Sequence, residues 1–289
     1  MLEIIEDTLL DSIKLLPFLF ITYLIMEYIE HKMGQKAKET IQKSGKFGPL
    51  IGSLLGIFPQ CGFSVSATNL YAGRVITLGT LIAVYLSTSD EMLPIFISEA
   101  VSPIVILKIL GVKLIIGIIA GFIVDFVVQM VKKKKGEKEE SVEMVGELCE
   151  HDHCHCDHDG IAKSAFKHTL NIFVFIVIVT FIINIAVFLI GEETISSILK
   201  NQPILGPIFA GLIGLIPNCA ASVIITNMYL QGVISVASMI TGLLTGAGVG
   251  LAVLFKTNKG VKKNIGIVCL VYVIGIISGI LLEIIGLKI

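Results

Sequence analysis

The sequence of 289 residues contains no tryptophan and few charges: only 16% of its residues are Asp, Glu, Lys or Arg, against roughly a quarter in soluble domains. The charges are clustered, so uncharged stretches such as residues 174–190 and 265–282 lie between them. A helix that spans a bilayer needs about 20 consecutive apolar residues. Several such stretches in one chain exclude a soluble domain of this size and predict an all-α polytopic membrane protein.

Other absences narrow the functional class. The net charge is only −1, which gives no general attraction to nucleic acid. The chain lacks a Walker-type phosphate loop, a His-Glu-x-x-His helix motif and a recognisable nucleophile–base pair, so we expect neither an ATP-driven pump nor an enzyme, and no required cofactor. The first seven residues lack the basic region of a cleaved signal, and the first apolar segment is therefore expected to remain as a helix.

An internal repeat organises the chain. At an offset of 158 residues, Gly48–Cys61 aligns with Gly206–Cys219 without a gap, and Gly117–Asp125 aligns with Gly275–Glu283. Shared apolar composition would align Leu with Ile by chance, but it would not hold Pro, Cys, Asn and Gly in one register. The sequence therefore predicts three parts: a first membrane repeat at 1–131, a linker at 132–160 and a second membrane repeat at 161–289.

Lysine placement predicts the orientation of the two repeats. Lysines cluster after the first helix (residues 32–46), in the linker (132–135) and late in the second repeat (256–263). The positive-inside rule places all three clusters in the cytoplasm only if each repeat crosses the membrane an odd number of times. The homologous halves would then have inverted topologies, as in many secondary transporters. Parallel repeats with an even number of crossings remain the alternative.

Several apolar stretches are too short to cross a bilayer. Residues 75–86 would rise only about 18 Å as a helix, against a core of about 30 Å, and residues 48–58 are similarly short. These stretches are predicted to be half-helices. Five segments per repeat, or three spans and a re-entrant hairpin, both give an odd number of crossings. We therefore expect about ten transmembrane segments, broken half-helices included.

The strongest candidate site lies where two apolar runs are interrupted at equivalent positions, by Pro59-Gln-Cys61 and by Pro217-Asn-Cys219. Proline breaks a helix, and paired breaks in two repeats point to a transport site. Ser and Thr four residues apart follow each break on one helix face. A proline kink with Ser and Thr bonded back to carbonyl groups is the alternative. The predicted substrate-binding residues at the two breaks are Gln60, Cys61, Ser64, Thr68, Asn69, Asn218, Cys219, Ser222, Thr226 and Asn227.

A second break follows at residues 87–91. Asp90 and Glu91 would lie within the membrane there, and an intramembrane acid is by default a functional residue. Both are therefore predicted substrate-binding residues, with a further use in proton or cation coupling. The alternative is a capping box from Thr88 to Glu91 that starts a helix at the membrane surface.

The linker contains a dense chelating tract, since residues 149–159 hold three Cys, four His and four acids. Thiolate and imidazole suit zinc, copper, nickel and similar ions, although the spacing is not that of a zinc finger. Low-complexity drift is the alternative. We predict that this flexible cytoplasmic arm binds a transition-metal ion through Cys149, His151, His153, Cys154, His155, Cys156 and His158.

Residues 58–71, 79–94 and 217–223 together resemble a family of prokaryotic ten-helix heavy-metal exporters, some of which are labelled arsenic efflux proteins or manganese transporters. The resemblance covers nearly the whole chain. It implies a multi-pass protein of the cell membrane that transports a metal or metalloid.

The favoured hypothesis is export of arsenite, manganese or a zinc-like ion by alternating access, driven by an ion gradient. A soft cargo would use Cys61 and Cys219, whereas a hard ion would depend on Asp90, Glu91 and amide oxygens. The alternative is a secondary carrier of a small organic anion, held by half-helix N-termini and Arg74, with a metal-regulated loop. The expected partners are the lipid bilayer and the cargo but no nucleic acid, and a homo-oligomer is left open.

Overall fold

The computed structural model describes residues 2–32, 47–58, 60–89, 91–135, 161–190 and 205–286. All regular elements in these residues are helices, without a strand among them, which confirms the predicted all-α fold. Pro59, Asp90 and the predicted metal ligands of the linker lie outside the described residues.

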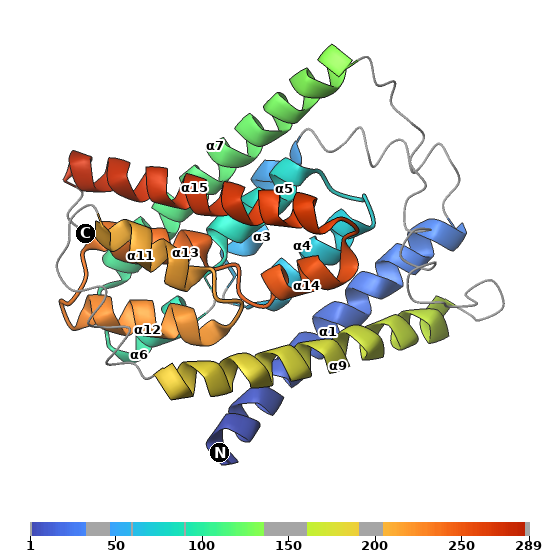
Figure 1. Ribbon diagram of the computed structural model, residues 1–289, viewed down its shortest axis with the longest axis horizontal. Helices are drawn as coiled ribbons and strands as arrows, with labels where there is room; N and C mark the ends of the chain where they lie inside the picture. The colour runs from blue at the N-terminus through green and yellow to red at the C-terminus, as the bar shows by residue number, and fades with distance from the viewer. Residues whose placement is uncertain are drawn as a thin grey trace.

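The helices of the two halves correspond one to one. Each helix of the second half begins within one residue of the position 158 residues after its counterpart (Figure 1). The first half contains α1 (Leu2–Lys32), α3 (Gly48–Gly56), α4 (Gly62–Ala72), α5 (Leu78–Ser87), α6 (Met92–Ser98) and α7 (Pro103–Lys135). The second half contains α9 (Ile161–Ile190), α11 (Leu205–Gly214), α12 (Cys219–Leu230), α13 (Val236–Thr245), α14 (Gly250–Thr257) and α15 (Val261–Ile285).

The described part of the chain has six stretches that are long and apolar enough to cross a membrane. They are Thr8–Tyr28, Leu78–Ser98, Pro103–Lys134, Ala162–Leu189, Val236–Thr257 and Val261–Ile285. Two of them each join two half-helices, α5 with α6 and α13 with α14. The short helices α3, α4, α11 and α12 bring the total to ten segments. The chain is therefore a polytopic α-helical membrane protein.

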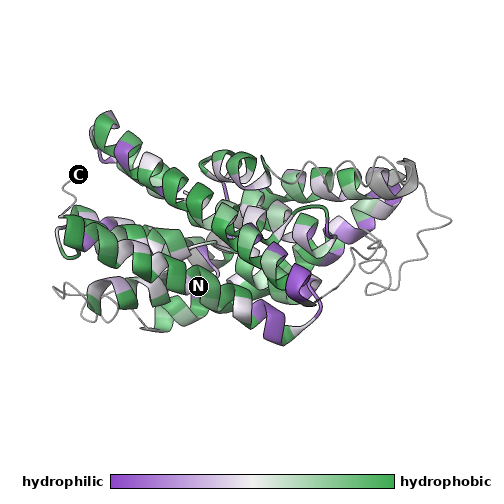
Figure 2. Ribbon diagram, turned by 90° about the horizontal axis from the view of Figure 1, so that it is seen from above, coloured by the Kyte–Doolittle hydropathy of each residue, from purple (hydrophilic) through white to green (hydrophobic). Residues whose placement is uncertain are grey.

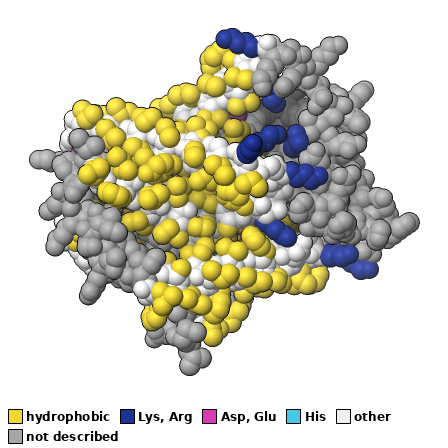
Figure 3. Space-filling model, in the orientation of Figure 1, with side chains coloured by type: hydrophobic (Ala, Val, Ile, Leu, Met, Phe, Trp, Pro, Cys, Tyr) yellow, Lys and Arg dark blue, Asp and Glu magenta, His cyan; other side chains and the backbone are white. Residues whose placement is uncertain are grey.

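The outer surface is apolar over most of the long helices. Large hydrophobic side chains such as Ile119 and Phe126 on α7, Ile178 on α9 and Ile277 on α15 are each more than half exposed. Figure 2 shows hydrophobic residues along most of each helix, and Figure 3 shows Lys and Arg side chains gathered on one side of the molecule, to the right. An apolar band with charges at one end suits a bilayer environment.

One acidic residue of α7 and one of α15 each bond to the N-terminal end of a half-helix. Thr77 caps α5 by accepting a hydrogen bond from the Thr80 amide, and Asp125 of α7 accepts hydrogen bonds from the Thr77 hydroxyl (2.7 Å) and the Gly79 amide (2.8 Å). In the second half Ser235 caps α13 and donates to Glu283 of α15 at 3.0 Å. A carboxylate at a helix N-terminus interacts favourably with the helix dipole, so both repeats position their central half-helix in the same way.

The two halves interlock. α4 packs on α14, and α12 packs on α6, so each half-helix after the first break contacts a half-helix of the other repeat. α5 and α13 also contact one another in the centre, while α1 and α9 cross as a separate pair on one side (Figure 1). This arrangement brings the two predicted break points, one from each half, into the middle of the molecule.

Candidate functional site

The two break points meet through their cysteines. We call residues 57–61 the first elbow and residues 215–219 the second elbow. The Sγ atoms of Cys61 and Cys219 lie 2.9 Å apart, and both residues are buried as free thiols. The elbows share a backbone turn, because the Gln60 amide donates to the Phe58 carbonyl (2.8 Å) and the Asn218 amide donates to the Ile216 carbonyl (2.7 Å). The repeated sequence therefore folds twice into the same local shape and pairs two thiols.

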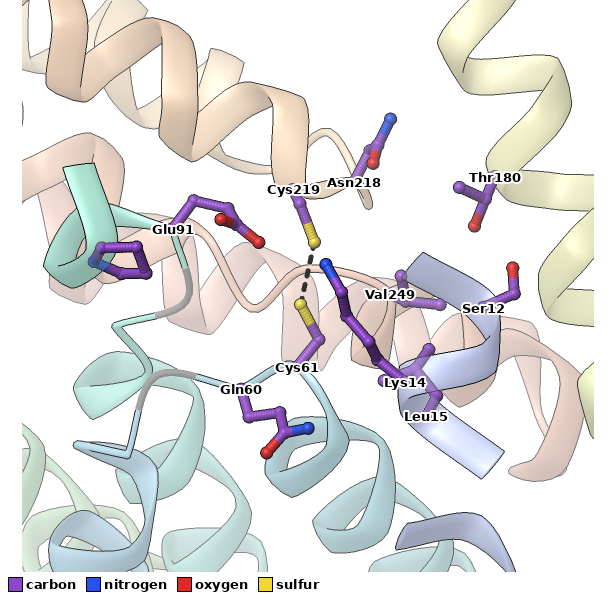
Figure 4. A pocket seen from close by; sticks show the side chains of 11 residues that line it. Ser12, Lys14, Leu15, Gln60, Cys61, Glu91, Thr180, Asn218, Cys219 and Val249 are labelled. Carbon is purple, nitrogen blue, oxygen red and sulfur yellow. Dashed lines mark hydrogen bonds between the residues drawn. The ribbon is translucent and has the colours of Figure 1, made fainter. Parts of the chain in front are cut away.

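A cavity of about 330 Å³ lies against the thiol pair. α1, α9, both elbows and the two breaks, between α5 and α6 and between α13 and α14, supply its walls (Figure 4). Its lining residues are Ser12, Lys14, Leu15, Gln60, Cys61, Glu91, Pro94, Thr180, Asn218, Cys219 and Val249.

The chemistry of this cavity is that of a soft-ion site with oxygen donors nearby. Cys61 precedes the first turn of α4 and Cys219 begins α12, so the partial positive charge of two helix N-termini stabilises negative charge on these sulfurs. In Figure 4 the Lys14 and Glu91 side chains point toward the thiol pair. Thiolates bind soft and borderline metal ions, while carboxylate and amide oxygens suit harder ones.

Five of the predicted substrate-binding residues line this cavity, namely Gln60, Cys61, Glu91, Asn218 and Cys219. The other described ones are not among its lining residues: Ser64, Thr68, Asn69, Ser222, Thr226 and Asn227.

The hydroxyls after each elbow bond to their own helix. Ser64 donates to the Cys61 carbonyl and Ser222 to the Cys219 carbonyl, both at 2.8 Å. Thr68 and Thr226 likewise donate to the carbonyls four residues earlier, both at 2.7 Å. Such bonds satisfy and often bend a membrane helix. The Thr68 hydroxyl also contacts the Tyr85 hydroxyl and the Gly250 carbonyl of the other half. The back-bonds expected in the alternative interpretation are therefore present, and a role of these hydroxyls in binding substrate stays a prediction.

The second break lies inside a membrane-length stretch. α5 ends at Ser87, and the Thr88 hydroxyl bonds back to the Val84 carbonyl at 2.7 Å. α6 begins only at Met92, with Glu91 at its N-cap and no side-chain capping bond. The capping box from Thr88 to Glu91 therefore does not form. Thr88 and Ser89 are fully buried, while Glu91 reaches the cavity.

A buried lysine that the sequence interpretation missed joins the two halves. Lys113 of α7 is fully buried. Its ammonium group donates to the carbonyl of Thr88, which caps the C-terminus of α5, and at 3.0 Å to that of Leu243 in the last turn of α13. A cation there offsets the negative ends of two half-helices. The sequence feature that could have identified Lys113 as functional is its charge inside an apolar stretch.

The cavity marks a difference between the halves. Thr22 of α1 and Thr180 of α9 are equivalent in the repeat. The Thr22 hydroxyl donates to Ser66 of α4 at 2.7 Å, and α1 packs along α4, whereas α9 approaches α12 more loosely. Thr180 is buried and lines the cavity, and its hydroxyl has no hydrogen-bond partner among the described residues. The cavity thus occupies the place where α9 would meet α12.

Further along α1 and α9 from the cavity-lining residues Leu15 and Thr180, the space between the helices is filled by apolar side chains. Cys61 and Cys219 belong to one buried cluster with residues of α1, α4, α9 and α14. We call the following members of this cluster the apolar plug: Leu19, Tyr23, Met26, Val65, Ala165, Ile172, Ile176 and Val253. The thiol pair therefore borders the cavity and also belongs to the buried cluster that contains the plug.

A comparison with family models gives a match to this chain. A family model described as "Putative, 10TM heavy-metal exporter" matches residues 2–189, which is well over half of the 289 residues. No curated protein and no solved structure matches the chain.

Proposed function

This chain belongs to the family of ten-transmembrane heavy-metal exporters, and we propose that it exports a soft heavy-metal or metalloid ion which Cys61 and Cys219 bind together. The observation that carries the proposal is the 2.9 Å approach of two thiols from different halves. One ion bound by both sulfurs would contact both repeats at once. A site that is shared in this way can respond when the repeats move relative to one another.

The cavity chemistry favours a thiol-seeking cargo. Arsenite and zinc-like ions bind thiolates, whereas manganese prefers oxygen ligands. Two sulfurs form the centre of the site, and Gln60, Glu91 and Asn218 surround it. We therefore rank arsenite or a zinc-like ion above manganese as the cargo. Asp90 lies outside the described residues, and its use in binding or coupling stays a prediction.

The transport cycle that we propose is alternating access. The thiol pair borders the cavity and belongs to the cluster that contains the apolar plug, and we place the cavity and the plug at the two ends of the transport path. Movement of the α1–α9 pair from α4 and α14 toward α12 and α6 would close the cavity, bring Thr180 onto α12 and open the plug. Inverted repeats produce such paired states readily. If the lysines on the plug side lie in the cytoplasm, the cavity opens to the outside in the present state. An ion gradient would drive the cycle.

The linker has a proposed part in loading. Its seven Cys and His side chains would capture a transition-metal ion in the cytoplasm and raise its concentration near the plug side. This assignment follows from composition alone. We further propose that the protein lies in the cell membrane of a prokaryote, with this linker in the cytoplasm.

One observation favours the second candidate, a carrier of a small organic anion. Lys14 places a cation in the cavity wall, beside the elbows. Arg74, the other predicted anion ligand, is exposed at a positive-φ position after α4 and is not among the cavity-lining residues. A paired thiol centre has no evident use in binding such an anion, so this candidate ranks second.

Growth of a deletion strain on arsenite, Zn²⁺, Cd²⁺ and Mn²⁺ tests the proposal. We expect the strain to become sensitive to at least one thiol-seeking ion and to recover with the wild-type chain. Cys61→Ser or Cys219→Ser should abolish recovery, while Cys269→Ser, at an exposed cysteine of α15, should not. Full recovery with both Cys61→Ser and Cys219→Ser would reject the proposed site. Unchanged sensitivity of the deletion strain to the whole panel would reject the proposed function.

A further inference from the structure

A second polar cluster lies beyond the apolar plug, between α1 and α9. The Nε2 atom of His168 is 3.6 Å from Oε1 of Glu27, and the Ser164 hydroxyl donates to that same oxygen at 2.7 Å. The Tyr23 ring stacks on the His168 ring with centroids 5.4 Å apart, and its hydroxyl donates to Asn69 of α4 at 3.3 Å. All five side chains are at most 3% exposed.

The cluster is joined to α4, from which the α1–α9 pair must separate if the plug is to open. Glu27 and Tyr23 belong to the first half, and His168 and Ser164 to the second. Tyr23 is itself a plug residue, and its bond to Asn69 ties the α1–α9 pair to the half-helix that carries Cys61. Opening of the plug would therefore require this cluster to rearrange.

The two ends of the α1–α9 pair differ in chemistry. At the cavity end amide and hydroxyl groups join the helices, since the Asn184 amide donates to the Thr8 hydroxyl at 2.9 Å and the Asn218 amide donates to Asn184. The repeat equivalents of Glu27 and His168 are Ile185 and Leu10, which cannot ionise. Only the plug end of the described pair is thus held by a carboxylate and an imidazole.

Proton binding at this cluster has a clear physical consequence. Histidine is the side chain that ordinarily titrates near neutral pH. A protonated His168 and an ionised Glu27 attract strongly in a site with little water, whereas removal of one partner charge leaves the other buried at high cost. Tyr23 and Ser164 contact the pair directly. The other charged groups on the packed helices are Lys256 of α14, 5.8 Å from the Phe175 ring of α9, and Lys163 and Lys167 of α9, which are exposed and whose charges are screened by solvent.

We propose that Glu27 and His168 form a proton-binding site that holds one proton while the plug side is closed and releases it when that side opens. This inference rests on the proposed export function in one respect: if the chain exports an ion, the ion that drives this export is a proton. If opening releases one proton, the ratio of open to closed molecules changes by up to about tenfold per pH unit.

Thiol accessibility tests this linkage without any metal. The full chain, with Cys149, Cys154, Cys156 and Cys269 replaced by serine, is placed in vesicles, and an impermeant maleimide labels Cys61 and Cys219 from each side separately. The readout is the ratio of the rate from the Lys-rich side to the rate from the cavity side. This ratio cancels the pH dependence of the thiols themselves.

The expected ratio rises up to about tenfold per unit between about pH 6 and about pH 8 in the wild-type background. His168→Gln and Glu27→Gln should each remove that rise, while Lys167→Gln, at the exposed neighbour, should keep it. Glu27→Gln alone decides the matter if His168→Gln does not fold. A flat ratio in the wild-type background, or an unchanged slope in Glu27→Gln, would overturn the inference. Because no metal is added, a negative growth panel with an intact slope would reject only the proposed cargo function.

Discussion

Single side chains at the elbows were the most predictable part of the site. A Pro, an amide and a Cys recur at the same repeat positions, and the structure brings Cys61 and Cys219 together. Ser12, Lys14 and Thr180 of the cavity wall could not be predicted in the same way. They lie on α1 and α9, and their approach to the elbows depends on how the two long helices cross, which no local pattern specifies.

Lys113 offers the clearest test of a single buried charge. Lys113→Met should lower the free energy of unfolding by about 1–3 kcal/mol, because the carbonyls of Thr88 and Leu243 lose a donor inside the protein. Thermal unfolding of the purified protein in detergent measures this. Lys108→Met, at an exposed lysine of the same helix, serves as the matched control. Equal melting temperatures for the two variants would contradict a bridging role for Lys113.

Helices and their junctions were predicted well where length alone decides. Residues 75–86 are too short for a span, and α5 indeed ends at Ser87. The start of α6 was less predictable, because Thr88 has two competing uses. Its hydroxyl can cap a following helix or bond back to the preceding one, and it takes the second at the Val84 carbonyl. Burial of the break decides this choice, and burial is not a local property.

Close packing of α5 on α7 depends on glycine. A Cβ atom at Gly79 would lie 2.1 Å from the Gly121 carbonyl oxygen, which is backbone and cannot turn aside, whereas one at Gly111 would meet nothing within 4 Å. We expect Gly79→Ala to destabilise the protein by about 1–3 kcal/mol through overpacking. Gly111→Ala on α7 should be neutral or stabilising by roughly 0.5–1 kcal/mol. Comparable thermal stability and folded yield for the two variants would show that α5 and α7 need no such close approach.

The chain as a whole departs from the symmetry of its sequence. Thr22 and Thr180 occupy the same repeat position, yet one bonds to α4 and the other faces the cavity. Because the two halves are similar, a conformation in which Thr22 and Thr180 exchange environments should have a similar free energy. The repeat therefore specifies a pair of conformations and does not select one of them. Fold class and the thiol centre were therefore predictable, whereas the side on which the cavity lies was not. The inverted relation of the halves remains a prediction.

The central claim is that one cargo ion binds to thiols from both halves. Cd²⁺ titration of the purified full chain, with Cys149, Cys154, Cys156 and Cys269 replaced by serine, tests it through the ultraviolet absorbance of the cadmium–thiolate bond. We predict one saturable ion per chain, and complete loss of this absorbance when either Cys61 or Cys219 alone is replaced by serine. Retention of about half the absorbance in each single variant would mean that the two sulfurs bind independently, and would contradict the shared site.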